Sequence, residues 1–322
     1  MARFLLLHGA CHGGWCWESV APILQSAGHQ TTASDLPCSD LTAGLSASAD
    51  AAVASLQGEV GDVVVVAHSL GALVAPLVAD RLPVRRMVML AGIVGAPRAS
   101  LEMLAAEDAD RDGPLGDGDP QTDSEGRFRF SPEGARRILY QDCPPEVADA
   151  AIARLRFERS MWTEVAQFEA WPEVETVSIT CTEDRVVNPG WSNRIARERL
   201  GVEPIELPGG HSPFLARPAA LAEVLLARPV VTDVTYRQGA GPVPAAIRKR
   251  VLGRDGRASY WKDAARCNSS VVAGIPRFTM AGWFGPSSVP TRGESRMPQR
   301  FQSATLVSDC YGGVGWLRFG TR

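Results

Sequence analysis

The run VVVVAHSLGALVA at residues 63–75 constrains the fold of this chain more than any other feature. Its four consecutive valines predict a buried strand, and the residues after Ser69 take up helical spacing. In a strand–turn–helix of this kind, the residues two before and two after the serine must be small, because the two backbones approach closely. Ala67 and Gly71 occupy those positions, with alanine where glycine is usual. The pattern predicts either a nucleophilic serine or an ordinary turn serine.

The rest of the first 228 residues alternates between strand and helix patterns. Such alternation is typical of a mostly parallel, doubly wound α/β sheet. We expect strands at residues 3–7, 29–37, 63–66, 84–92, 176–181 and 202–208, and helical spacing at 13–28, 46–57, 70–79, 191–200 and 218–226.

Between about residues 95 and 171 the alternation stops. An acidic loop rich in Gly and Pro, EDADRDGPLGDGDP, is followed by helical segments within 132–168. This interruption predicts an inserted, mainly helical cap over the sheet. The predicted organisation is therefore one α/β domain at residues 1–228, which includes the cap, and an extension at 229–322.

The extension differs from the rest of the chain in charge. It contains 14 Lys+Arg against 5 Asp+Glu and both lysines of the chain, and Gly and Pro interrupt it throughout. We predict either a weakly structured extension that is not native to the evolved domain, or a small accessory domain containing Trp261, Trp283 and Trp316. The basic charge is its one hint of nucleic-acid binding, and because no binding motif accompanies it, we expect no nucleic-acid partner.

Composition favours a soluble globular protein. Of the 322 residues, 45% are hydrophobic and 21% are charged, and no apolar run approaches the roughly 18 residues that a membrane span requires. The opening MARFLLLHGA has too short an apolar run for a signal peptide, which predicts a cytoplasmic protein without membrane contact. The seven cysteines form no C-x-x-C pair, so we expect free thiols. His8, Cys11 and His12 lack a second ligand cluster, so we expect no metal site.

Two later motifs supply partners for the serine. A serine hydroxyl is a weak nucleophile that needs an adjacent base, which a carboxylate in turn orients. CTEDRVV places Asp184 just after an expected strand, and LPGGHSPF places His211 in the loop after the next strand. The chain order Ser, Asp, His is that of hydrolases with a serine at such a turn. Glu183 is an alternative to Asp184.

The loops after the first and third expected strands suggest an oxyanion site. Backbone N–H groups can stabilise the anion that forms during acyl transfer. Leu70 begins the helix after the serine, and HGACHGGW, after the first strand, supplies a second donor that we place at Ala10. The alternative is a glycine-rich turn without this role.

The remaining histidines and several aromatic residues are weaker candidates. We expect the side chain of His68 to point away along the turn, and His8 and His12 to have a packing or substrate-contact role. The aromatic residues could line a pocket or form ordinary core. The candidate pocket residues are Gly9, His12, Trp15, His68 and Trp162, with Phe128, Phe130, Tyr140 and Trp171 as further aromatic residues.

These motifs together resemble a known family. The segments FLLLHGACHGGWCWESVAPILQSAGHQTTASDLP, AHSLGALVA, TEDRVVNPGW and GGHSPFLARPAALAEVL look like α/β-hydrolases of the plant methylesterase and hydroxynitrile lyase group and their bacterial esterase relatives. The resemblance covers about residues 3–227 and implies the α/β-hydrolase fold. It implies Ser69 as nucleophile, His211 as general base and acid, Asp184 as orienting carboxylate, and oxyanion donors at the amides of Ala10 and Leu70.

The group contains two chemistries, and two positions help to separate them. The lyases carry a threonine after the first-loop histidine and a lysine after the catalytic histidine, whereas this chain has Gly9 and Ser212 there and no lysine before residue 249. We therefore expect a serine esterase, without a metal or organic cofactor, that hydrolyses small to medium carboxylic esters with an apolar acyl or aryl part. The alternatives are a hydroxynitrile lyase-like activity and a ligand receptor without turnover.

Overall fold

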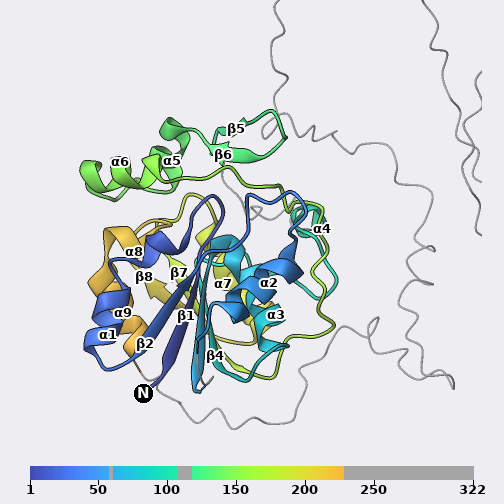
Figure 1. Ribbon diagram of the computed structural model, residues 1–322, viewed down its shortest axis with the longest axis vertical. Helices are drawn as coiled ribbons and strands as arrows, with labels where there is room; N and C mark the ends of the chain where they lie inside the picture. Colours follow the sequence, from blue (N-terminus) through green and yellow to red (C-terminus); the bar gives the residue numbers. More distant parts are fainter. Residues whose placement is uncertain (58–60, 108–117, 228–322) are drawn as a thin grey trace, which may run out of the picture. The chain divides into compact units, whose positions relative to one another are not determined.

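In the computed structural model, residues 1–57, 61–107 and 118–227 are described. Most of the predicted acidic loop and the predicted extension at 229–322 lie outside these residues. A single parallel sheet of six strands organises the described part of the chain, with strand order β2-β1-β3-β4-β7-β8 (Figure 1). The strands are β1 Arg3–Leu7, β2 Gln30–Ser34, β3 Val63–His68, β4 Val84–Leu90, β7 Glu175–Cys181 and β8 Ile205–Leu207. The predicted parallel α/β sheet is therefore confirmed.

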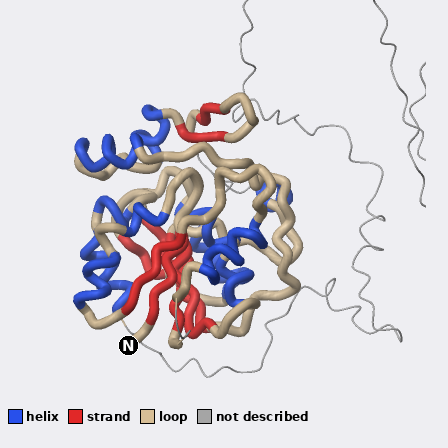
Figure 2. The backbone as a smooth tube through the Cα atoms, viewed as in Figure 1, coloured by secondary structure: helices blue, strands red, loops and turns tan. Residues whose placement is uncertain are grey.

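Alternating side chains of the strands pack on helices at both faces of the sheet. Phe4 and Leu6 of β1 lie in one buried cluster with residues of α1 Ala21–Ser26 and α9 Pro218–Leu226. Leu5 and Leu7 point to the opposite face, in a cluster with residues of α2, α3 and α7. These helices are α2 Leu45–Ala54, α3 Ala75–Ala79 and α7 Pro189–Ile195, which continues into a π-helical turn at Ala196–Leu200. Figure 2 shows the helices on either side of the strands.

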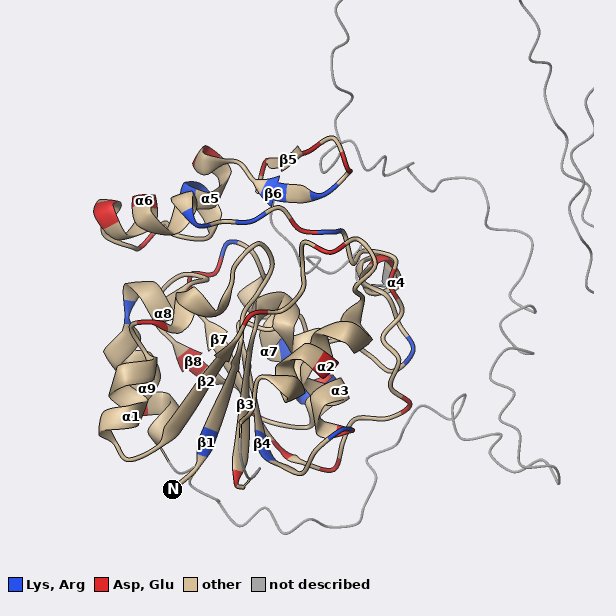
Figure 3. Cartoon of the chain, in the orientation of Figure 1, with Lys and Arg blue, Asp and Glu red and all other residues tan. Residues whose placement is uncertain are grey.

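The charged residues of β1 and β4 lie near the amino ends of these strands. β1 begins with Arg3, and Arg85 and Arg86 stand near the start of β4 (Figure 3). β3 contains no Lys, Arg, Asp or Glu and is buried along its whole length. A central strand that is buried on both faces therefore leads into the turn at Ser69.

The order of the strands contains a switch point at β1 and β3. The chain runs from β1 to β2 on one side and then crosses back to β3 on the other side of β1. Connections that leave in opposite directions open a crevice beyond the carboxyl ends of such strands, which is where α/β sheets bind ligands. The loops after β1 and β3 both lie at this switch point.

One expected helix is divided in two. Helical spacing over residues 13–28 predicts one helix, but the structure has a 3-10 turn at Gly14–Trp17 and then α1, which begins at Ala21. Pro22 lies in the first turn of α1, where its missing N–H leaves no helical bond unmade. The turn at Ser69 is likewise a 3-10 helix, Ser69–Leu73, before α3 begins.

The segment between β4 and β7, called the inserted segment below, lies beyond the carboxyl edge of the sheet (Figure 1). Its described elements are α4 Leu101–Glu107, the antiparallel hairpin of β5 Pro120–Thr122 and β6 Phe128–Phe130, α5 Pro132–Ile138 and α6 Pro145–Ala153. Residues 154–174 contain neither helix nor strand, apart from one bridge between Glu158 and Phe128. The segment is thus less helical toward β7 than the sequence predicts.

Among the described residues, the structure contains no helix with the length and apolar character needed to cross a bilayer.

Candidate active site

The turn at Ser69 has a strained backbone. Ser69 follows β3, has a φ of 51° and is 3% exposed. A left-handed conformation costs a residue other than glycine about 1–2 kcal/mol, and such strain is concentrated at functional sites. A Cβ at Gly71 would lie 2.7 Å from the His8 carbonyl oxygen, and one at Gly9 would lie 2.7 Å from the Cβ of Ser69. The loop after β1 therefore packs directly against this turn.

His211 and Asp184 form a buried pair at the same edge of the sheet. His211 lies in the loop after β8 and Asp184 in the loop after β7. His211 Nδ1 donates a hydrogen bond to Asp184 Oδ2 at 2.8 Å, and the two residues are 1% and 8% exposed. Asp184 Oδ1 accepts from the N–H groups of Val186 and Val187 at 2.7 and 2.9 Å. These contacts orient the carboxylate toward Nδ1 and leave Nε2 of His211 for another partner.

The alternative carboxylate, Glu183, is exposed. Its carbonyl oxygen accepts a hydrogen bond from Gln141 of the inserted segment at 2.9 Å. Asp184 is the one of the two neighbouring acids that the structure brings into contact with His211.

The expectation that His68 points away from this region is wrong. Its Nε2 lies 2.9 Å from the carbonyl oxygen of His211, to which it can donate, and the two rings are 4.6 Å apart. Phe214 packs edge-on against His68 with ring centroids 4.8 Å apart. His68, which directly precedes Ser69, therefore links the end of β3 to the His211 loop. Through this contact two predicted site residues, His68 and His211, lie side by side.

His12 lies at the centre of an aromatic cluster. Trp15 stacks on it at 5.4 Å, and the rings of His68, Tyr140 and Phe214 meet it edge-on at 6.0, 5.9 and 5.8 Å. His12 Nδ1 can donate to the Ala10 carbonyl oxygen at 2.7 Å, which leaves Nε2 to accept from the Tyr140 hydroxyl at 2.8 Å. The candidate pocket residues His12, Trp15 and His68 thus lie together, as does Tyr140.

Three histidines of this region are held uncharged. Burial lowers the pKa of His8 to about 4 and that of His12 to about 3, and it lowers the pKa of His68 well below the usual value. His8 can then donate from Nδ1 to the Gly9 carbonyl oxygen and accept the Leu36 N–H at Nε2. At neutral pH these three imidazoles carry no charge.

The two candidate oxyanion donors lie on adjoining loops. Leu70 is in the first turn after Ser69, and Ala10 is a half-buried residue of the loop after β1. Gly9, next to Ala10, leaves no room for a Cβ because the side chains of His68 and Ser69 fill that position. Their roles as donors stay predictions.

Two backbone hydrogen bonds of Trp162 lie within the inserted segment, and its side chain packs against the core cluster that includes Leu5 and Leu7. Its N–H donates to Ser160 Oγ at 3.3 Å, and its carbonyl oxygen accepts from the N–H of Glu102 at 3.0 Å. Phe128 and Phe130 pack against each other in the β5–β6 hairpin, as part of the core. Of the two expectations for the aromatic residues, pocket lining and ordinary core, the contacts of Phe128 and Phe130 agree with ordinary core.

Several polar residues of the inserted segment hold the site loops, and no sequence pattern indicated them. Asp142 Oδ2 accepts the N–H of Gly210 at 2.9 Å and also bonds Arg217. Farther along, the guanidinium of Arg156 donates to the His12 carbonyl oxygen at 2.7 and 2.9 Å, and Glu158 bonds the N–H of Cys11. The one signal that could have found Asp142 is the pair of glycines before His211, because a Cβ at Gly209 or Gly210 would lie 2.7 Å from its carboxylate.

Among the described residues, no group of three or more His, Cys, Asp or Glu side chains is arranged to hold a metal ion. The arrangement instead combines a strained serine after a central strand with a histidine–carboxylate pair from the loops after two further strands. These features define the α/β-hydrolase class of fold.

The chain belongs to the alpha/beta hydrolase family, whose model matches residues 4–224. It is 29% identical over 255 residues to salicylic acid-binding protein 2 of Nicotiana tabacum, which covers 70% of this chain and 95% of that protein. It is 27% identical over 251 residues to methyl jasmonate esterase 1 of Vitis vinifera, with coverage of 69% and 95%. The resemblance to the plant methylesterase group is thereby confirmed.

Solved structures show the same fold. Polyneuridine aldehyde esterase superposes with a TM-score of 0.58 at 20% identity, covering 70% of this chain and 98% of that one. A pyrethroid hydrolase from Sphingobium faniae gives a TM-score of 0.58 at 21% identity, covering 70% and 96%.

Proposed function

We propose that this protein is a serine esterase that hydrolyses small to medium carboxylic esters with an apolar acyl or aryl part. The observation that carries the proposal is the buried hydrogen bond between His211 and Asp184, beside the strained turn that holds Ser69. The relatives named as esterases support the reaction class.

In the proposed mechanism, Ser69 attacks the ester carbonyl while His211 Nε2 takes the hydroxyl proton. Asp184 holds the proton on Nδ1 and stabilises the imidazolium that forms. The amides of Ala10 and Leu70 stabilise the oxyanion, and His211 returns the proton to the departing alcohol. Water, activated by the same histidine, then hydrolyses the acyl-serine. Every step uses groups of the chain itself and water.

The neutral histidines support an uncharged substrate. His8, His12 and His68 supply polar groups without a fixed charge, and the aromatic rings around His12 supply an apolar surface. An ester with an apolar acyl or aryl part matches this combination. Serine, not lysine, follows His211, and the sequence has no lysine before residue 249, which gives no support to cyanide chemistry. The compartment that we propose is the cytoplasm.

The proposal is tested with a panel of p-nitrophenyl and methyl esters and one cyanohydrin, each incubated with the wild type and with Ser69→Ala. We expect turnover of esters by the wild type, a loss of at least about a thousandfold in the variant, and no cleavage of the cyanohydrin. Cyanide release would instead support a lyase. Tight ligand binding without repeated turnover would support a receptor.

A further inference from the structure

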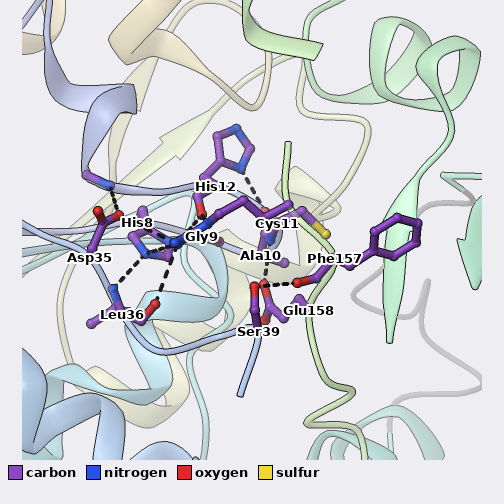
Figure 4. A network of polar contacts seen from close by, with 12 residues as sticks. His8, Gly9, Ala10, Cys11, His12, Asp35, Leu36, Ser39, Phe157 and Glu158 are labelled. Atoms are coloured by element: carbon purple, nitrogen blue, oxygen red, sulfur yellow. Dashed lines mark hydrogen bonds and ion pairs between the residues drawn. The ribbon is translucent and has the colours of Figure 1, made fainter. Parts of the chain in front are cut away.

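A carboxyl group of the inserted segment lies beneath the loop after β1 (residues 8–13, the β1 loop). Glu158 is 0% exposed, and its Oε2 accepts the backbone N–H of Cys11 (Figure 4). The backbone of Glu158 is itself fixed, because it exchanges two hydrogen bonds with Phe128 at 2.7 and 2.8 Å. The carboxyl group therefore presents an acceptor from a rigid position.

The residue that it binds has a strained backbone. Cys11 has a φ of 61°, in the left-handed region that residues other than glycine seldom adopt. The inserted segment also donates to this residue from the Arg156 N–H, which bonds the Cys11 carbonyl oxygen at 2.8 Å. Both backbone polar groups of Cys11 are thus held by residues more than 140 positions away in sequence.

Cys11 directly follows Ala10, the proposed oxyanion donor. The N–H of Cys11 belongs to the peptide unit that joins the two residues, so the bond to Glu158 fixes that unit. Donors for an oxyanion must lie within a few tenths of an ångström of their working position, because the interaction is made only as charge develops. The bond to Glu158 thus restrains the backbone on the carboxyl side of Ala10, whose own N–H belongs to the preceding peptide.

We propose that Glu158 is a positioning residue for the oxyanion site, which holds the β1 loop in its strained conformation by accepting the Cys11 N–H. This inference rests on the proposed esterase function. Glu158 does not touch the substrate; it acts through the Ala10–Cys11 peptide.

The surroundings of Glu158 indicate that it acts as an acceptor rather than as a charge. Burial raises its pKa to about 7, while the Cys11 N–H, Arg156, Arg159 and the Cys38 thiol lower it by smaller amounts. Near neutral pH the side chain is therefore poised between its acid and its carboxylate. Each form retains an oxygen that can accept the Cys11 N–H. Glutamine also retains such an oxygen, whereas leucine does not.

The test compares Glu158→Leu, Glu158→Gln and Glu158→Asp with the wild type on one p-nitrophenyl ester. We expect Glu158→Leu and the shorter Glu158→Asp to lower kcat about 10- to 100-fold with KM within about twofold, because the oxyanion contact strengthens only in the transition state. Glu158→Gln should retain kcat within about threefold. The Asp variant keeps the test available if the Leu variant does not fold.

Glu164→Leu is the matched control. Glu164 also lies in the inserted segment, and its Oε1 accepts the N–H of Leu45 at 2.6 Å, at the start of α2. It thus ties the same segment to the α/β domain outside the candidate site, and its loss should leave kcat within about twofold. Equal losses in the Glu158→Leu and Glu164→Leu variants would show a general effect of loosening the segment and would overturn the inference.

A second readout separates this inference from the esterase proposal. A trifluoromethyl ketone forms an anionic adduct with an active serine, and Glu158→Leu should weaken its binding by the same factor as kcat/KM. Unchanged kcat and inhibitor affinity in both Glu158→Leu and Glu158→Asp would overturn the inference alone. If the wild type hydrolysed no ester, amide exchange would still decide: faster exchange at Cys11 in Glu158→Leu but not in Glu158→Gln supports the positioning role, and equal exchange contradicts it.

Discussion

The central sheet and the inserted segment contribute to the candidate site in different ways. The sheet positions the side chains that we propose to react: Ser69, Asp184 and His211 follow β3, β7 and β8, whose carboxyl ends lie at one edge of the parallel sheet. The inserted segment instead supplies side chains that bond the backbone of the site loops, as Asp142 does at Gly210 and Glu158 at Cys11.

This difference separates two levels of positioning. Strand register and apolar packing bring these groups to the same edge, and both involve many residues. The precise position of each site loop instead depends on single hydrogen bonds with the inserted segment, such as those at Gly210 and Cys11. Substitutions at the sheet edge should therefore abolish the chemistry, whereas substitutions in the inserted segment should weaken it by graded amounts.

The largest effect is expected at Asp184, on the sheet edge. Changing Asp184 to Asn keeps the size of the side chain but removes the acceptor that fixes the His211 tautomer, so we expect kcat to fall about a thousandfold or more. The matched control is Glu183→Gln, because Glu183 is adjacent in sequence but exposed. A rate close to that of the wild type in Asp184→Asn, or similar losses in both variants, would show that the sheet edge does not act as described.

A smaller effect is expected in the pH dependence of stability. Because burial raises the pKa of Glu158 from 4.5 to about 7, the folded state binds more protons than the unfolded state between these values. The stability of the wild type should thus fall by about 3 kcal/mol relative to Glu158→Gln as the pH rises from about 4.5 to about 7. Urea unfolding at a series of pH values measures this difference, and a pH-independent difference would contradict it.

His8 and His12 change the stability with pH in the opposite direction, and by the same amount in the wild type and in Glu158→Gln. The pKa values of His8 and His12 are lowered to about 4 and 3 from 6.5, so their contribution to stability is complete above pH 6.5 and is lost as the pH falls toward those values. The difference in free energy of unfolding between the wild type and Glu158→Gln cancels this shared contribution and leaves the contribution of Glu158.

The smallest effect is expected at Asp142. Asp142→Ala removes the acceptor for the Gly210 N–H, one residue before His211, and we expect kcat to fall about tenfold, because the His211 loop loses one of its contacts with the inserted segment. The control is Asp149→Ala, in the same segment, where an exposed carboxylate pairs with Arg136 on the surface. If the two variants retained equal activity under saturating substrate, the inserted segment would not position this loop.

Much of the sheet and of its edge is predictable because its signals are local. Four valines followed by AHSLG show a buried strand and its turn, and the expected places of Asp184 and His211 agree with the observed hydrogen bond. The expectation of one continuous helix at 13–28 was wrong, and the reason is also local. Apolar spacing alone did not reveal that the chain would turn before Ala21, where α1 begins with Pro22 in its first turn.

The contribution of the inserted segment could not be predicted in the same way. Glu158 stands in a stretch without helical or strand periodicity, so nothing in RFER distinguishes a buried acid from an exposed one. Its environment is created by Cys11, 147 positions earlier. His68 shows the same limitation, because its contact with His211 depends on how the β8 loop folds back onto the end of β3.

The central claim, that the side chain of Ser69 is the nucleophile, is tested most directly by trapping its acyl intermediate. The wild type and Ser69→Ala are mixed with a slowly hydrolysed p-nitrophenyl ester, quenched in acid, digested and analysed by mass spectrometry. We expect the peptide containing Ser69 to gain the mass of the acyl group in the wild type, with no acylated peptide in the variant. Hydrolysis by the wild type with no acyl group on Ser69, or undiminished hydrolysis by Ser69→Ala, would contradict the account.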